Sequence, residues 1–570
     1  MSKGWKSVVV MIAAVALGWT AAAWAQEPVG DWHGTLTAGP AQLRIGVTIK
    51  AKAGGGYEGS LLSPDQTPQP IPLDTVKAEG GALSFSINAI AGSYEGKWDA
   101  AQKAWVGQWS QGAALPLVLT AGKPDTPPAA VIEGLDGDWA ATIAMPNAGS
   151  QRLVMHVRTA AGSTVATLDL PDQLALGLAV RPFTRQGQTV RFTMPANGAT
   201  FEGSLAVDGK SIAGTWTGPA FKGPLTFTWR AAQTSGPARP QTPKPPFSYR
   251  TEEVFVDSAP GVKLAGTLTL PQGKGPFPAV VMITGSGAQD RDETILGHKP
   301  FAVIADRLTR DGIAVLRMDD RGFAKSTGNF ATATDDDFAV DTAADVAFLR
   351  TRPDIDPKRV GLIGHSEGGL VAPKVAAKDP KIAFVVLMAG PGVPLAEVLR
   401  AQRAKLMPAM GASPELIRKS QALVDRVVLA MKDAKDEADA RARALQAAKA
   451  EGGDLIPEAQ RQAAAVQLSS GWMRNLLDYD PAPTLAKVKC PILALNGSKD
   501  GQVIPDQNLP AIRAATRGNP DVTITELPGL NHLFQTANTG AVGEYADIEQ
   551  TVAPIALDAM SVWIVKHTTR

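Results

Sequence analysis

Hydrophobic and polar positions follow two different patterns along the chain, and the change falls near residue 247. Before it, apolar and polar residues alternate in short runs, as from Leu43 to Ile49 and from Val190 to Met194. A period of two residues is that of a half-buried strand. After it, continuous apolar runs alternate with helical patterns, and continuous runs are typical of strands covered on both faces. The pattern predicts an all-β first part followed by an α/β part.

The second part, residues 248–570, alternates strand and helix. Strands are expected over 278–283, 313–318, 360–363, 383–388, 491–495 and 522–527, and helices over 300–310, 341–350 and 555–565. This order predicts a doubly wound, mostly parallel sheet. A long helical insertion at 395–478 interrupts it, and Ser413-Pro414 looks like an N-cap followed by proline at the first helical position. We expect the insertion to cover the strand ends as a lid; the alternative is an elaboration away from the site.

The first part contains an internal repeat with an offset of 107 residues. The offset relates Gly30-Asp31-Trp32 to Gly137-Asp138-Trp139, Pro64-Asp65-Gln66 to Pro171-Asp172-Gln173, Phe85 to Phe192, Tyr94-Glu95-Gly96 to Phe201-Glu202-Gly203, and Trp109 to Trp216. So many matches at one offset indicate a duplication. We expect two small antiparallel β domains, barrels or sandwiches, over 26–122 and 133–231. A proline-rich linker, 232–247, follows them and should be extended and semi-rigid.

Seven of the twelve tryptophans lie in these two copies. They could line a groove for a sugar or lipid, and a polymer or envelope ligand for the β domains is therefore possible. We favour the other interpretation, in which the repeated tryptophans are core residues of a duplicated fold.

The N-terminus has the features of a secretory signal peptide. Lys3 and Lys6 precede an apolar run of about a dozen residues, which is short of the roughly 20 needed to span a bilayer. Ala23-Trp24-Ala25 supplies small residues for cleavage before Gln26. Removal of residues 1–25 lowers the net charge from +1 to −1. We therefore expect a periplasmic or secreted protein with no stable membrane anchor after cleavage.

The composition limits the kinds of molecule that the protein is expected to bind. Lys and Arg (56) nearly balance Asp and Glu (55), and no basic stripe occurs, so nucleic acid is not expected as a partner. Cys490 is the only cysteine, which excludes an internal disulfide. No cluster of histidines and carboxylates has metal-ligand spacing, and we therefore expect no metal.

One segment carries most of the chemical signal, Gly364-His365-Ser366-Glu367-Gly368. It follows an apolar strand and precedes small residues, and this G-x-S-x-G context predicts a nucleophile elbow that exposes the Ser366 hydroxyl. A serine needs a base, and the base needs a carboxylate that holds its tautomer. The expected chain order is serine, acid, histidine.

The base and the acid that would act with Ser366 can be selected by elimination. Of the six histidines, only His532 and His567 follow the serine, and His567 lies close to the chain end, which is a poor place for a group that needs fixed geometry. His532 is therefore the expected base. Asp500 ends the preceding strand in a Gly-rich turn and is the expected acid. Asp506 is the runner-up, with helix capping as its other role.

An oxyanion hole needs two backbone N–H groups. One is expected from Glu367, the residue after the nucleophile, and the other from the loop Thr284 to Ala288, with Ser286 first and Gly287 second. The charged run 289–293 beside this loop could bind a polar substrate group, but we favour bracing of the loop by ion pairs. Asp319 and Asp320 precede the serine and are expected to order the loop beneath the site.

Residues 250–570 resemble the α/β-hydrolase superfamily, in particular exported bacterial carboxylesterases near the serine aminopeptidase and dienelactone hydrolase groups. The resemblance rests on five segments: 285–293, 320–322, 364–368, 497–500 and 531–532. It implies an eight-stranded sheet, a Ser–His–Asp triad and no cofactor. The oxyanion loop departs from the lipase pattern, because Thr284-Gly285 stands where lipases have a His-Gly pair.

Three functions are compatible with these features. The first is an exported serine hydrolase that cleaves small carboxylic esters through an acyl-enzyme. The second is a peptidase or aminopeptidase with the same triad, in which Glu367 or the 290–293 run would bind the substrate's ammonium group. The third is a polymer- or envelope-binding protein in which the β domains are the binding modules.

Overall fold

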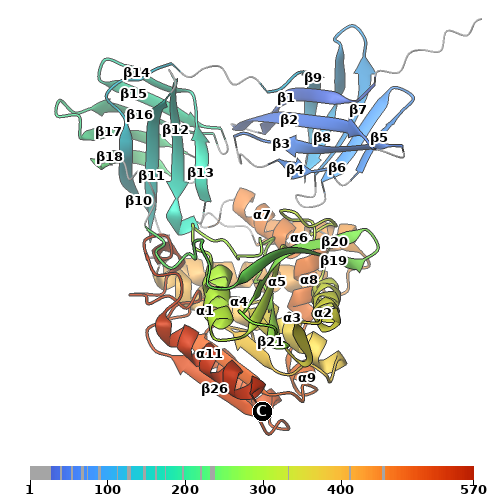
Figure 1. Cartoon of the computed structure of the whole chain (residues 1–570). Helices are drawn as coiled ribbons and strands as arrows, with labels where there is room; N and C mark the ends of the chain where they lie inside the picture. The colour runs from blue at the N-terminus through green and yellow to red at the C-terminus, as the bar shows by residue number, and fades with distance from the viewer. Residues whose placement is uncertain are drawn as a thin grey trace, which may run out of the picture.

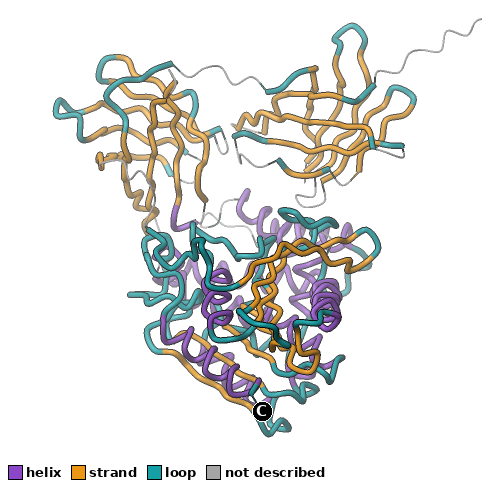
Figure 2. The backbone as a smooth tube through the Cα atoms, in the orientation of Figure 1, coloured by secondary structure: helices purple, strands orange, loops and turns teal. Residues whose placement is uncertain are grey.

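The computed structural model describes residues 27–569 except 39–40, 53–54, 66–69, 74, 88–91, 112, 125–129, 146–148, 161–162, 174, 196–197, 219–220, 231–237, 331–332, 410–411, 452–455 and 457. The expected signal peptide, 1–25, lies outside the described residues. Figure 1 shows two β domains side by side above a larger α/β domain, and Figure 2 shows that strands make up almost all of the regular structure in the upper pair.

The first β domain is one nine-stranded antiparallel sheet. Its strands are β1 (Gly30–Ala38), β2 (Ala41–Ala51), β3 (Tyr57–Leu62), β4 (Ile71–Pro72), β5 (Thr75–Glu79), β6 (Ala82–Ile87), β7 (Gly92–Asp99), β8 (Ala104–Gln111) and β9 (Ala113–Ala121). They pair in the order β4-β3-β2-β1-β9-β8-β7-β6-β5. β3 also lies against β5, so the sheet curls back on itself around its core.

The second β domain repeats this strand order. Its elements are β10 (Gly137–Met145), β11 (Gly149–Ala160), β12 (Ser163–Leu170), the short helix η2 (Pro171–Gln173), β13 (Ala175–Val180), β14 (Phe183–Gln186), β15 (Thr189–Met194), β16 (Ala199–Leu205), β17 (Ser211–Thr217) and β18 (Lys222–Arg230). The sheet order is β13-β12-β11-β10-β18-β17-β16-β15-β14.

The repeated tryptophans fill the interiors of the two sheets. Trp32 and Trp139 are almost fully buried, and their indole N–H groups donate to the carbonyls of Pro28 and Leu135, at 2.7 and 2.8 Å. Trp109 and Trp216 are buried as well. The expectation that these are core residues is confirmed.

Each β domain contacts the next domain through an equivalent arginine–aspartate pair. In the first domain Arg44 binds Asp65, which also contacts Arg181 of the second domain. In the second domain Arg152 binds Asp172 and reaches the α/β domain, where it contacts the Gly543 carbonyl and forms a 2.6 Å ion pair with Asp547. The same corner of the sheet thus serves as the contact in both copies.

The α/β domain is built on an eight-stranded sheet. Its strands are β19 (Arg250–Ala259), β20 (Val262–Leu270), β21 (Phe277–Ile283), β22 (Ala314–Met318), β23 (Ile355–His365), β24 (Val385–Met388), β25 (Ile492–Gly497) and β26 (Val522–Leu527). The order is β19-β20-β22-β21-β23-β24-β25-β26. β19 and β20 are antiparallel and the strands from β22 to β26 are parallel. The prediction of a mostly parallel, doubly wound sheet is confirmed.

Helices cover both faces of this sheet. Apolar residues of α1 (Pro300–Arg310) and α11 (Pro554–Thr568) pack on one face. Those of α2 (Asp335–Thr351), α3 (Gly368–Lys378), α9 (Ala482–Leu485) and α10 (Pro505–Ala515) pack on the other. Within the described residues, no helix is both long enough and apolar enough to cross a bilayer.

The insertion between β24 and β25 is helical, as expected. It contains α4 (Leu395–Ala409), α5 (Pro414–Met431), α6 (Glu437–Ala450), α7 (Glu458–Leu468) and α8 (Gly471–Asp478), which share a small core of their own. The predicted N-cap is present, because the Ser413 hydroxyl accepts the Leu416 N–H at 3.2 Å.

The described half of the proline-rich linker lies on the α/β domain. The Arg239 guanidinium donates to the carbonyls of Leu296, Ala546 and Ile548, and the Gln241 amide donates to Val552. This part of the linker is therefore attached to the loop 536–552, which includes the short helix η3 (Val542–Glu544), and is not a free spacer.

Candidate active site

The nucleophile elbow is formed where β23 ends and α3 begins. Ser366 has a φ of +52°, a strained conformation for a residue with a side chain, and its N–H donates to the Met388 carbonyl at 2.8 Å. Glycine is required on both sides. A Cβ on Gly364 would overlap the Gly368 carbonyl, and one on Gly368 would overlap the Ile283 carbonyl. The turn thus presents the Ser366 side chain at the carboxyl edge of the sheet.

His532 and Asp500 lie together at the same edge. Asp500 follows β25 and His532 follows β26, and His532 Nδ1 is 2.8 Å from Asp500 Oδ2. The second carboxylate oxygen, Oδ1, accepts the N–H groups of Gln502 and Val503, at 2.8 and 2.9 Å. Asp500 is 1% exposed and His532 is 5% exposed. The carboxylate is thereby fixed on both sides, and the His532 ring is oriented through its Nδ1.

The two runner-up residues lie elsewhere. Asp506 is exposed in the first turn of α10. His567 stacks on Trp563, hydrogen-bonds the Trp563 carbonyl, and pairs with Asp521 at 3.4 Å. Asp521 comes just before β26, so His567 is at the amino edge of the parallel strands, opposite the elbow.

His365 is a buried residue of the site that elimination by chain order passed over. Its Nδ1 is 2.8 Å from Glu293 Oε1, and its Nε2 is 3.1 Å from the His532 carbonyl. Both partners are acceptors, so both ring nitrogens carry protons. Burial lowers the pKa of His365, but the charge and hydrogen bond of Glu293 outweigh it and raise the pKa overall. The resulting cation ties the elbow to the backbone of His532.

The loop after β21 lies directly beside the nucleophile. A Cβ on Gly285 would lie 3.3 Å from the Ser366 Cβ, and the Gly285 N–H donates to Glu293 at 2.8 Å. Ser286 follows and lines the same cavity as Ser366 and Glu367. Gly287 has a φ of +92°, and in the described part of the chain it is not among the residues that line this cavity.

The charged run 289–293 braces this loop through ion pairs, which is the interpretation that we favoured from the sequence. Arg291 forms a bidentate pair with Asp319, Arg317 contacts Asp292, and Asp320 accepts both the Thr284 hydroxyl and the Gln289 N–H. Burial raises the pKa of Asp320 to about 7, although those two hydrogen bonds lower it.

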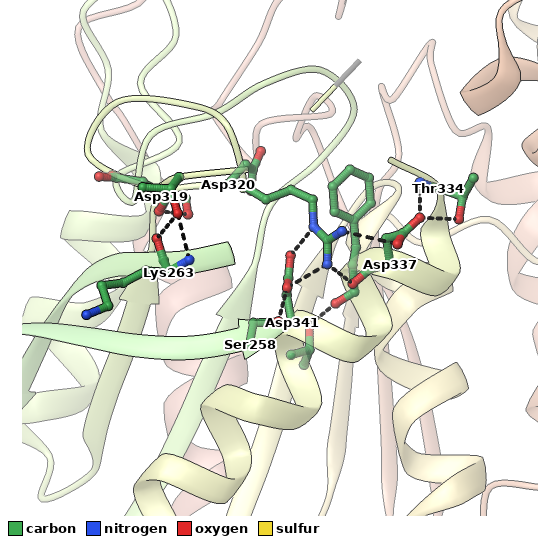
Figure 3. Close-up of polar contacts among 12 residues, drawn as sticks. Ser258, Lys263, Asp319, Asp320, Thr334, Asp337 and Asp341 are labelled. Carbon is green, nitrogen blue, oxygen red and sulfur yellow. Dashed lines mark hydrogen bonds and ion pairs between the residues drawn. The ribbon is translucent and has the colours of Figure 1, made fainter. Parts of the chain in front are cut away.

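A second group of ion pairs continues the bracing toward α2. Arg321 donates to Asp341 and Asp337, and Asp337 also accepts the Thr334 hydroxyl in a capping box that begins the helix (Figure 3). In Figure 3 Asp337 and Asp341 point from one side of α2 toward the guanidinium between them. These contacts fix the loop 319–330 against α2, because Arg321 of the loop is paired with carboxylates of the helix.

A cavity of about 220 Å³ opens at Ser366 beneath the insertion. Helices α4 and α8 supply much of its wall. The lining residues are Ser286, Ser366, Glu367, Leu370, Pro391, Leu395, Val398, Leu399, Gln402, Trp472, Met473, Leu476, Gln502 and Val503. The insertion therefore covers Ser366 as a lid would, and its apolar side chains make the site suited to an apolar group.

The Glu367 side chain connects the elbow to the lid. Its Oε1 accepts the Trp472 indole N–H at 2.7 Å, and Trp472 lies on α8. Burial and, after it, the charge of the neighbouring Asp335 raise the pKa of Glu367 to about 8. Trp472 and Asp335 were not predicted as site residues, because neither lies near a recognisable motif. Among the described residues, no group of three or more histidines, cysteines and carboxylates is arranged to hold a metal.

The sheet order and the elbow define an α/β hydrolase domain, and comparison with known proteins agrees. The X-Pro dipeptidyl-peptidase family (S15) matches residues 260–527. Esterase EstD of Thermotoga maritima is 28% identical over 326 residues, which cover 56% of this chain and 69% of the esterase. Thiohydrolase aneE of Aspergillus aculeatus is 32% identical over 173 residues, 30% of this chain and 49% of that protein.

Among solved structures, the Pyrococcus furiosus esterase PF2001 has a TM-score of 0.37 and 17% identity, with 59% of this chain and 98% of that chain covered. The matches to the peptidase family and to the esterase, together with the eight-stranded sheet and its elbow, support an esterase-like protein of the α/β-hydrolase superfamily.

Proposed function

We propose that the protein is a serine hydrolase of carboxylic esters, with Ser366 as nucleophile, His532 as general base and Asp500 as the acid that orients it. The observation that carries the proposal is the 2.8 Å contact between His532 and the buried Asp500 at the edge of the sheet where the strained Ser366 emerges. Catalysis of this kind needs the Nδ1 proton held by the carboxylate, so that Nε2 is free to accept the serine proton.

The reaction then follows from the residues in place. Ser366 Oγ attacks the acyl carbon while its proton passes to His532 Nε2, and the carbonyl oxygen becomes an oxyanion. The amides of Glu367 and Ser286, with Gly287 as the second choice, stabilise that charge. The alcohol leaves with the proton from His532. Water attacks the acyl-enzyme by the same route and releases the carboxylic acid.

The cavity indicates the size of group that is bound. At about 220 Å³ it is below the roughly 300 Å³ at which drug-sized pockets begin, and above the roughly 150 Å³ that takes up benzene. Its wall is mostly apolar; besides Ser366, the polar lining residues are Ser286, Glu367, Gln402 and Gln502. A short apolar or single-ring acyl group fits this space.

The test compares wild type with Ser366→Ala on a chain-length series of p-nitrophenyl esters. We expect the variant to lose at least about 10³-fold in kcat, as when a triad member is removed. Activity should be highest for short acyl chains and fall once the chain exceeds the cavity. Wild-type turnover by Ser366→Ala would refute the proposal.

A peptidase with the same triad is the second candidate, favoured by the match to the S15 family. An aminopeptidase needs an ionised carboxylate near Ser366 for the substrate's ammonium group. Glu367 is occupied by Trp472, and burial raises its pKa, while the run 289–293 is engaged in bracing contacts. These contacts favour the esterase. Faster cleavage of aminoacyl or X-Pro anilides than of matched esters would reverse this order.

We further propose that the β domains arose by duplication and that the protein acts after export. The identical strand order, the paired tryptophans and the equivalent Arg44–Asp65 and Arg152–Asp172 pairs support duplication. The buried tryptophans argue against their use as a binding groove. Deletion of residues 26–235 tests the alternative. Unchanged kinetics on small esters with lost activity on a polymeric ester would support a polymer-binding role, and insoluble protein would indicate structural packing.

A further inference from the structure

The carboxyl group of Glu367 is enclosed where three segments meet. It belongs to the elbow, its Oε1 accepts the indole N–H of Trp472 in the lid, and it lies beside Ser286 of the loop that follows β21. The residue is only 6% exposed. Its own backbone N–H is the first expected donor to the oxyanion. The charge on this side chain is therefore felt where negative charge develops during the reaction.

A second carboxyl group, Asp335, faces it. Asp335 is the first residue of α2 and is fully buried, and its side chain lies next to that of Glu367. Glu367 Oε2 and both oxygens of Asp335 have no N–H or O–H donor in the structure. Two ionised carboxylates in this arrangement would be buried, repelling and unsolvated. One proton between them satisfies an oxygen of each group.

The surrounding charges indicate which group keeps the proton. Lys374 Nζ lies 3.7 Å from Asp335 and 3.0 Å from the exposed Asp336, and it stacks on the ring of Tyr479. The cation favours ionised Asp335. Burial and then the charge of Asp335 raise the pKa of Glu367, against smaller lowering by Trp472 and Ser286.

The other ionisable groups that face Glu367 do not change which of the two carboxyl groups keeps the proton. They line a small cavity of about 50 Å³ on the other side of its carboxyl group: Asp319, Asp320, Arg321, Asp341 and Asp345. Arg321 is paired with Asp341, and Arg291 is paired with Asp319. Burial raises the pKa of Asp345, and it raises that of Asp320 to about 7, so Asp320 carries its full negative charge only above neutral pH.

We propose that Glu367 is a positioning residue that must be neutral, through the proton it shares with Asp335, to hold Ser286 and the lid helix α8 without placing a negative charge beside the oxyanion. The inference rests on the proposed ester hydrolysis. When the proton leaves, the new carboxylate opposes the oxyanion bound by the adjacent amide. Two like charges this close in a partly desolvated site slow the reaction by about 10- to 100-fold.

The experiment measures kcat/KM for a short p-nitrophenyl ester between about pH 6 and pH 10 in four proteins. In wild type we expect activity to fall above about pH 8, the value to which the pKa of Glu367 is raised. In Glu367→Gln, whose side chain cannot ionise, the fall should vanish when the profile is scaled to its own maximum. In Asp335→Asn, the new amide can donate to Glu367 and favour its ionised form, so the fall should move to lower pH. Asp506→Asn, an exposed neutralisation in the first turn of α10, should leave the midpoint in place.

A second measurement needs no catalysis. The Trp472 contribution to fluorescence, taken as the difference between Ser366→Ala and Ser366→Ala/Trp472→Phe, should titrate with the wild-type midpoint because the indole is bonded to Glu367. A wild-type alkaline fall that persists in Glu367→Gln, or a Trp472 signal that is flat with pH, would overturn the inference. In either case, inactivity of Ser366→Ala would still support the ester hydrolase. Full activity of Ser366→Ala would instead refute the proposed function itself.

Discussion

Replacement of Asp500 by asparagine should remove most of the activity without unfolding the protein. Asp500 Oδ1 accepts two backbone N–H groups, from Gln502 and Val503, and Oδ2 faces His532 Nδ1 at 2.8 Å. In the variant the amide oxygen keeps the two backbone donors, which leaves the amide NH₂ group pointing at Nδ1. The ring must then accept at Nδ1 and carry its proton on Nε2. It can no longer take the proton of Ser366.

The expected loss is about 10⁴-fold in kcat, or about 5 kcal/mol of transition-state stabilisation, which is the cost of the wrong tautomer in a serine triad. Stopped-flow or steady-state hydrolysis of a short p-nitrophenyl ester measures it. Thermal unfolding should change little, because the backbone hydrogen bonds are kept. Asp506→Asn is the matched control, an exposed acid on the first turn of α10 that should stay within about twofold of wild type. An Asp500→Asn enzyme within tenfold of wild type would refute the assignment of Asp500.

Three further predictions concern stability and domain contacts. Trp139→Ala should destabilise the second β domain by about 3–5 kcal/mol, because the indole is fully buried. Calorimetry should show the unfolding transition of that domain at a lower temperature, and an unchanged transition would contradict the assignment of Trp139 to the core. Arg152→Ala should speed proteolytic cleavage between the second β domain and the hydrolase domain. It should lower the free energy of unfolding by only about 1 kcal/mol or less, because the Arg152–Asp547 pair is largely exposed. Equal cleavage rates in the variant and wild type would show that this contact does not hold the two domains together. Burial raises the pKa of the Asp320 carboxyl from 3.8 to about 7, so the folded state binds this proton more tightly than the unfolded state. The stability of the fold therefore falls as the pH rises from about 4 to about 7. Asp320→Asn should flatten the dependence of Tm on pH in this range, and an unchanged slope would exclude Asp320 as the source of that dependence.

The elements with a clear period were predictable. The expected strand over 522–527 and the expected helix over 300–310 coincide with β26 and α1. The helix expected from 341 begins earlier, at Asp335, because its first turn is acidic and is stabilised by the Thr334 capping box, not by an apolar stripe. The strand expected from 360 begins at Ile355, and the sequence did not indicate this because the partly exposed stretch 356–359, with Asp356, Lys358 and Arg359, separates Ile355 from the apolar run.

Candidate site residues could be proposed from the sequence where the order of residues along the chain leaves few choices. A serine in an elbow needs a later acid and histidine at strand ends, and six histidines leave few candidates. The contacts of His365 with Glu293 and of Glu367 with Trp472 join residues 72 and 105 positions apart. No local pattern marks such pairs, because each residue taken alone has an ordinary role in a helix or a loop.

The linear sequence is enough to predict the succession of β and α/β parts, the repeat at an offset of 107 residues, and Ser366, His532 and Asp500 as a candidate triad, because period, spacing and order are properties of the chain. It does not show that each β domain is a single curled sheet filled with tryptophan, or that α4 and α8 of the insertion cover Ser366; the folded structure shows both. It also decided that two buried carboxyls meet behind the nucleophile. Burial and the approach of distant charges set these features, and both arise only when the chain is folded.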